Sequence, residues 1–413
     1  MPEELKLHPK LYGRRGPKTG YSHLAKAVVC ETTRCVQKMH GAIAGKSFGI
    51  LRRIPLISGP AGLVQSAHDT IAGSVYTAIQ LASRGLFAAS AIVEGSGARL
   101  PASKPPGRLA SGLRSVINGA FGDLLAESDN RLAISMAIRL HGATIPLAPD
   151  SLRSAFPEPG QRLCVFLHGL SCDEHFWDPG AAAAPTDVHF GRQLRAEFDY
   201  TPLYLRYNTG LPIAENGVQL ARLLDELLAA WPQVASEVLI VGHSMGGLIA
   251  LAGVEAAAAA QMRWPQLTRM LICLGSPHLG SPVERLGQLT TLALNLSSVT
   301  APLGEIAARR SQGIKDLRSG PGAARNPPAH DHIAFRFLGA SLAEDSEHPF
   351  GRFFGDGLVT PGSATAHAID GDVEIARLGG LGHMRLLTDE RVYRQIREWV
   401  AALHADTDRR SSE

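Results

Sequence analysis

The stretch LIVGHSMGGLIA at residues 239–250 constrains the fold more than any other part of the chain. Its apolar first half predicts a strand, its second half predicts a helix, and Ser244 lies between them in the pattern Gly-x-Ser-x-Gly. Glycine neighbours permit such an abrupt turn, which leaves the serine hydroxyl at the end of the strand. Because a chain with 43 glycines also produces this pattern by chance, the flanking strand and helix are what favour a catalytic serine.

A catalytic serine needs a base, because its hydroxyl is a weak nucleophile until its proton is removed. His383, in the segment GGLGHMRLL, follows the last predicted strand and precedes the closing helix, and we predict that it is this base. His367 and His278 are the alternatives. His278, in GSPHLGSP, precedes every candidate acid and so breaks the chain order nucleophile, acid, base.

The acid must hold the imidazole in one tautomer and stabilise its charged form. Asp356, in the segment FFGDGLVTPGSA, is the predicted acid, since a glycine on each side lets its carboxylate approach closely. The alternatives, in more polar surroundings, are Asp345, Asp370 and Asp372.

An oxyanion hole needs backbone N–H groups directed at the developing negative charge, and each donor can lower the barrier by about 3 kcal/mol. One predicted donor is Met245, directly after Ser244. The other is Leu170, in the segment VFLHGLSCDEHFW, where a glycine permits a sharp turn after a strand. We predict that the residues lining the substrate site are His168, Gly169, His243 and His278.

The segments FLHGL, GHSMGG, GSPHLGSP and DGLVTPGSA, in this order and followed by His383, resemble the α/β-hydrolase lipases and esterases. Bacterial triacylglycerol lipases and GPI-inositol-deacylase-like lipases are the groups they are most similar to. The resemblance extends over about residues 132–405 and implies acyl-ester chemistry without a particular substrate. It implies the same roles for Ser244, Asp356, His383, Leu170 and Met245.

Apolar strand-like segments alternate with amphipathic helices over this part of the chain, which predicts a mostly parallel sheet covered by helices on both faces. Residues 133–147 predict a β-hairpin that turns at His141-Gly142. The predicted strands are 163–168, 202–207, 237–242, 269–275, 333–339 and 373–379, and the predicted helices are 216–231 and 389–405.

The first 128 residues have a different character, because they are basic and alanine-rich, with helical runs at 62–95 and 109–127. We predict an N-terminal helical region at 1–128 and a catalytic domain at 129–407. The N-terminal region could pack on the catalytic domain, contact a membrane surface peripherally or bind a partner. The leucine-rich insertion at 283–326 is either a cap over an acyl pocket or a helix packed on the sheet.

Composition excludes several classes of protein. A net charge of +3 in 413 residues gives no strong field for nucleic acid, and five scattered cysteines form no disulfide framework. Cys164 and Cys273 lie in apolar runs and are predicted to be buried. Some lipases of the resembling groups bind calcium near the catalytic histidine, but Asp389 is the nearest downstream carboxylate and no second ligand is evident. We therefore expect no metal and no cofactor.

The residues together predict a serine hydrolase that cleaves carboxylic esters of small molecules or lipids through an acyl-enzyme. An acyltransferase or thioesterase with the same catalytic residues is one alternative, and a lipid-surface-binding protein with a vestigial hydrolase domain is another. The sequence contains no evident secretory signal or membrane span, so we expect a cytoplasmic protein that is soluble or peripheral to a membrane.

Overall fold

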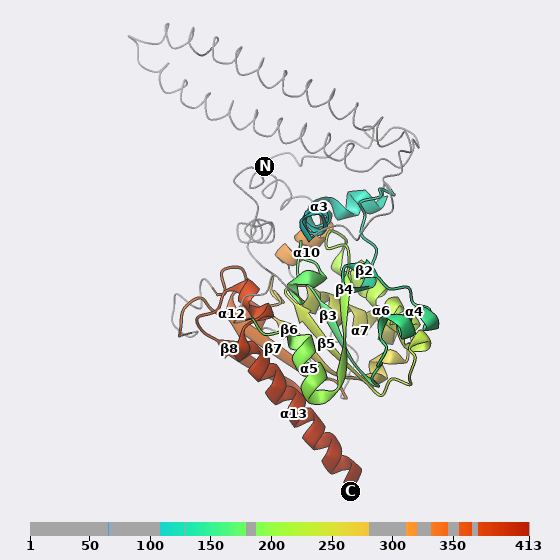
Figure 1. Ribbon diagram of the computed structural model, residues 1–413. Coiled ribbons are helices and arrows are strands. Elements are labelled where there is room, and N and C mark those ends of the chain that lie inside the picture. The colour runs from blue at the N-terminus through green and yellow to red at the C-terminus, as the bar shows by residue number, and fades with distance from the viewer. Residues whose placement is uncertain are drawn as a thin grey trace. The chain divides into compact units, whose positions relative to one another are not determined.

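The computed structural model describes residues 65, 108–127, 129–178, 187–280, 311–319, 332–345, 355–365 and 371–412 (Figure 1). The chain divides into two compact units, one of Met1–Ser103 with Glu127–Leu132 and one of Lys104–Ala126 with Ala133–Glu413. Most of the first unit lies outside the described residues, including the helical run expected at 62–95 apart from Gln65. The predicted boundary at residue 128 stays a prediction, and the following account concerns the second unit.

The second unit contains an eight-stranded sheet with the order β2-β1-β4-β3-β5-β6-β7-β8. The first two strands form an antiparallel hairpin, β1 pairs antiparallel with β4, and all the other pairs are parallel. The strands are β1 (Ala137–Leu140), β2 (Ala143–Thr144), β3 (Arg162–Leu167), β4 (Tyr200–Arg206), β5 (Glu237–His243), β6 (Thr268–Leu274), β7 (Ala334–Ala340) and β8 (Val373–Leu378).

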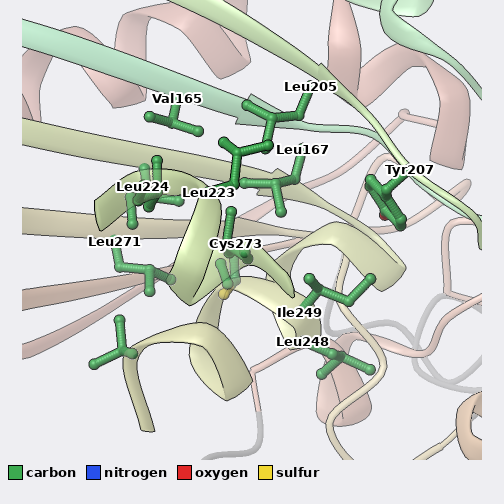
Figure 2. Close-up of a cluster of buried hydrophobic side chains, with 14 of the residues drawn as sticks. Val165, Leu167, Leu205, Tyr207, Leu223, Leu224, Leu248, Ile249, Leu271 and Cys273 are labelled. Atoms are coloured by element: carbon green, nitrogen blue, oxygen red, sulfur yellow. The ribbon is translucent and has the colours of Figure 1, made fainter. Parts of the chain in front are cut away.

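Helices cover both faces of this sheet, because alternate residues of each central strand point to opposite faces. On one face, Val165 and Leu167 of β3 pack with residues of α6 (Ile213–Ala230) and α7 (Met245–Ala259), as Figure 2 shows. On the other face, Phe166 packs in the cluster that contains residues of α5 (Phe190–Phe198) and α13 (Glu390–Ser412). The expected sheet with two helical layers is therefore confirmed.

Each predicted strand forms, with ends that shift by one or two residues, and the predicted hairpin turns where it was expected. His141 and Gly142 both have positive φ, 49° and 79°, as a two-residue hairpin turn requires. Cys164 and Cys273 are buried as predicted. Three of the described α-helices were not predicted, namely α4 (Pro149–Ala155), α5 and α12 (Pro361–Ala364).

The helix expected at 109–127 is present as α3 (Arg108–Glu127), and all of it except its last residue belongs to the same compact unit as the sheet. Of the leucine-rich insertion at 283–326, the structure describes 311–319, which include α10 (Gln312–Ser319), so the choice between cap and packed helix stays open. None of the described helices is long and apolar enough to cross a membrane.

Candidate active site

Ser244 occupies the turn between β5 and α7 in a strained backbone conformation. Its φ of 53° and ψ of −122° are unusual for a residue with a side chain and cost about 1–3 kcal/mol. The neighbouring glycines are required because the backbone passes too close to them for a side chain. A Cβ on Gly242 would lie 2.4 Å from the Gly247 nitrogen, and a Cβ on Gly246 would lie 2.5 Å from the Leu167 oxygen. The predicted strand–serine–helix turn is confirmed.

His383 and Asp356 form a buried pair. The Nδ1 atom of His383 lies 2.7 Å from Oδ2 of Asp356, and both side chains are almost completely inaccessible to solvent. The second carboxylate oxygen accepts hydrogen bonds from the backbone N–H groups of Leu358 and Val359, at 2.9 and 2.8 Å. Because a carboxylate only accepts, Nδ1–H donates to it, so Nε2 is the unprotonated nitrogen whenever the ring is neutral. This Nε2 atom is buried and has no hydrogen-bond partner among the residues that the structure describes.

Residues beside Ser244 bring the serine turn and the His383 loop together. His243 directly precedes Ser244, and its Nε2 donates a hydrogen bond to the His383 carbonyl oxygen at 3.1 Å. The two imidazole rings lie with their centroids 4.5 Å apart. The pKa of His243 is well below its usual range, first because of burial and second because of the nearby His383. His243 is therefore neutral and holds the His383 loop against the end of β5.

The oxyanion loop, which we define as residues 168–173, follows β3 and lies against the serine turn. A Cβ placed on Gly169 would lie 3.1 Å from the Cβ of Ser244. Ser171 has a φ of 59°, and its N–H donates to Oγ1 of Thr209 at 3.1 Å. The structure records no hydrogen bond from the N–H of Leu170 or Met245 to another described residue. Met245 directly follows Ser244, and Leu170 directly follows Gly169, which lies against Ser244, and neither N–H group has a partner among the described residues.

His168 is fully buried at the start of this loop. Its ring stacks on Tyr207, with centroids 4.3 Å apart and an interplanar angle of 7°, and its Nδ1 lies 2.9 Å from the Gly169 oxygen. The Tyr207 hydroxyl donates a hydrogen bond to the His168 carbonyl oxygen. These contacts fix the loop, whereas the substrate contacts predicted for His168, Gly169 and His243 stay predictions.

The other predicted residues either have different contacts or lie outside the described residues. His278 is half-buried and packs edge-on against Phe337, at 5.0 Å between centroids. Asp372 pairs with Arg336 at 2.8 Å, and Asp345 is exposed. Asp370 and His367 lie outside the described residues. Of the candidate acids that the structure describes, Asp356 is the one that contacts His383.

The order of these features along the sheet decides the fold. A serine turn follows β5, the candidate acid lies between β7 and β8, and the candidate base follows β8. The chain has an α/β-hydrolase fold.

Comparison with known proteins gives one family match over part of the chain and several distant structural similarities. Residues 216–314 match the family model described as PGAP1-like alpha/beta domain, and no curated protein matches the chain. A thermophilic esterase from Thermogutta terrifontis is similar at 16% identity and a TM-score of 0.36, over 60% of this chain and 92% of that chain. Lipase B from Aspergillus fumigatus is similar at 15% identity and a TM-score of 0.35, over 61% of this chain and 57% of the lipase chain. The NocB thioesterase domain is similar at 16% identity and a TM-score of 0.35, over 57% of this chain and 91% of the thioesterase chain.

A buried ionic network beside the oxyanion loop was not predicted. Arg206, at the end of β4, contacts Asp173 at 3.3 Å and Glu174 at 2.5 Å, and Arg139 contacts Glu174 at 3.3 Å. Asp173, Glu174 and His175 have the spacing of metal ligands, but guanidinium groups already contact both carboxylates. The sequence signals were the acidic pair Asp173-Glu174 at the end of the loop and an arginine ending an apolar strand.

Acidification is expected to destabilise the protein through His168. Burial lowers its pKa to about 4, against the opposing effects of the Gly169 carbonyl and of nearby carboxylates. Between the unfolded value of about 6.5 and this value, the unfolded chain binds a proton that the folded chain lacks, so stability falls as the pH falls. The full loss is about 3 kcal/mol for His168, and neutral His243 adds to it.

Urea unfolding of the wild type and of His168→Asn between pH 4 and pH 7.5 measures this effect. Asparagine removes the titrating ring and keeps a side-chain N–H donor. The free energy of unfolding should rise with pH more steeply in the wild type than in the variant. We expect the two slopes to differ by about 1 kcal/mol per pH unit. Equal slopes in the two proteins would show that His168 does not titrate as described.

Proposed function

We propose that the chain is a serine hydrolase that cleaves carboxylic esters through an acyl-enzyme. The observation that carries this proposal is the buried His383–Asp356 pair beside a strained serine turn. Perturbed backbone and buried charge of this kind are costly to a fold and concentrate at functional sites. The α/β-hydrolase fold and the match of residues 216–314 to the PGAP1-like alpha/beta domain support the same class of reaction.

The proposed reaction has two halves. The Ser244 hydroxyl oxygen attacks the ester carbonyl while Nε2 of His383 takes its proton, and Asp356 stabilises the imidazolium through Nδ1–H. The N–H groups of Leu170 and Met245 donate to the tetrahedral oxyanion, which also faces the N-terminus of α7. His383 then gives the proton to the leaving alcohol. In the second half, water attacks the acyl-enzyme with His383 again as base, and the acid is released.

Two alternative functions share these residues and are separated by product analysis. An acyltransferase would pass the acyl group from Ser244 to an alcohol rather than to water, and a thioesterase would prefer a sulfur leaving group. A lipid-surface-binding protein with a vestigial hydrolase domain would not turn over either substrate. Peripheral membrane contact of residues 1–128 stays a prediction, because most of that region lies outside the described residues.

The experiment is a rate series on p-nitrophenyl esters of increasing acyl length, with matched thioesters and with added alcohol. We expect hydrolysis of the oxygen esters with a maximum at one chain length. Preferred thioester cleavage would favour a thioesterase, and a transacylated alcohol as main product would favour an acyltransferase. A folded protein that cleaves none of these substrates would contradict the proposed function.

A further inference from the structure

The helix α3 lies against the loops that follow β3 and β4, at two of its glycines. A Cβ on Gly119 would lie 2.1 Å from Oγ and 3.3 Å from Cα of Ser171, the residue after the predicted donor Leu170. A Cβ on Gly122 would lie 1.8 Å from Oδ1 of Asn208. A Cβ at either point would force the facing loop side chain to shift, because the helix backbone packs directly against Ser171 and Asn208.

The loop after β4 joins the helix to the oxyanion loop through successive residues. Asn208 donates from Nδ2 to the Gly122 carbonyl oxygen at 2.9 Å. Thr209 accepts the Ser171 N–H at 3.1 Å. Asn208 is itself held by Asn216 of α6, whose Nδ2 donates to the Asn208 carbonyl oxygen at 2.9 Å. A displacement of α3 would therefore move Ser171 directly and through this loop.

A bend in α3 makes these contacts available. Phe121 has φ of −138° and ψ of 17°, which is not helical, and such a break frees carbonyl groups from the helical ladder. The carbonyl of Gly119 accepts a hydrogen bond from the Ser311 hydroxyl at 2.7 Å, and that of Gly122 accepts from Asn208. Nearer the start of the helix, the Ser111 hydroxyl donates to Asp173 at the end of the oxyanion loop, at 2.8 Å.

We propose that α3 positions the oxyanion site, with Gly119 as the positioning residue that sets the place of Ser171 and so of the Leu170 N–H. The inference rests on the proposed function for its catalytic consequence, while its structural consequence is independent of it. The helix lies outside the segment that matches the PGAP1-like domain and outside the part of the chain that resembles lipases. It is thus a part of this active site that this chain supplies from its N-terminal side.

The test compares Gly119→Ala with Gly112→Ala in the same helix, where an added Cβ would meet nothing within 4 Å. We expect Gly119→Ala to lower kcat on the preferred p-nitrophenyl ester about tenfold, because a displaced N–H weakens oxyanion stabilisation, with KM changed less than threefold. Gly112→Ala should keep kcat within twofold and keep or raise the melting temperature, since alanine favours the helix. Ser171→Gly in the Gly119→Ala background removes the clashing hydroxyl, and its kcat should return to within threefold of Ser171→Gly alone.

Amide hydrogen exchange of a peptide containing the oxyanion loop gives a readout that does not need turnover. We expect exchange in this peptide to be several-fold faster in Gly119→Ala than in Gly112→Ala, and to return in the double variant. Failure of the wild type to cleave esters would contradict the proposed function, while the exchange data would still decide the role of α3. Equal kcat and equal exchange in the two alanine variants would overturn the inference, as would a lowered melting temperature with unchanged kcat or a double variant that is not restored.

Discussion

Replacing Asp356 by asparagine is expected to lower kcat for ester hydrolysis about 10⁴-fold while leaving the fold intact. The reason lies in the two backbone N–H groups, of Leu358 and Val359, that donate to Oδ1. They would keep the amide oxygen of the asparagine on their side and direct its NH₂ group at Nδ1 of His383. That nitrogen would then accept, so the ring proton would move to Nε2, and Nε2 could no longer take the proton of Ser244.

Steady-state rates and circular dichroism of Asp356→Asn and Asp372→Asn measure this effect. Asp372 is the matched control, because it was an alternative acid in the sequence and its carboxylate instead pairs with Arg336 near the surface. We expect Asp372→Asn to keep kcat within about twofold. Loss of activity in Asp372→Asn with activity retained in Asp356→Asn would show that Asp356 is not the catalytic acid.

Replacing Arg206 by methionine is expected to lower the free energy of unfolding by about 3–5 kcal/mol. The Arg206 side chain is 6% exposed and contacts Asp173 and Glu174, which are 3% and 6% exposed. Burial acts to raise the pKa of Asp173, but hydrogen bonds from His175 and Ser111 and the charge of Arg206 hold it below its usual range. Methionine keeps most of the volume and leaves two buried carboxylates short of a cation.

Urea unfolding at pH 7 measures this loss, with Arg153→Met as the control. Arg153 pairs with Asp150 at 2.5 Å, but the two side chains are 58% and 93% exposed, so this pair should contribute less than about 1 kcal/mol. The Arg206 deficit should shrink as the pH falls toward the unfolded pKa of Asp and Glu, about 4, because protonated carboxyls need no cation. Equal losses in the two variants would contradict a stabilising role for the buried network.

The sheet could be predicted from the sequence because its central strands are buried on both faces and appear as short apolar runs. Helix α5 could not, since nine residues with the sequence FGRQLRAEF bury only Phe190, Gly191 and Leu194, too few for a clear period. The serine turn and the order of Ser244, Asp356 and His383 followed from local sequence patterns.

The contacts that support the site could not be predicted, because they join residues far apart in the chain. Arg206 contacts Ser111 from 95 positions away, and Asn208 contacts Gly122 from 86. Sequence patterns predicted the helix α3, and packing on the catalytic domain was one of the roles predicted for the N-terminal region. They gave no sign that its glycines lie against the loop of Leu170, since spacing within a helix does not specify its partner.

The most direct test of the central claim, an activated nucleophile at Ser244, is labelling with a fluorophosphonate probe in the wild type and in Ser244→Ala. The account predicts that the folded wild type is labelled, that mass spectrometry of its peptides locates the adduct on Ser244, and that the alanine variant is unlabelled while its melting temperature is retained. Labelling that persists in Ser244→Ala, or a folded wild type that the probe does not label, would contradict it.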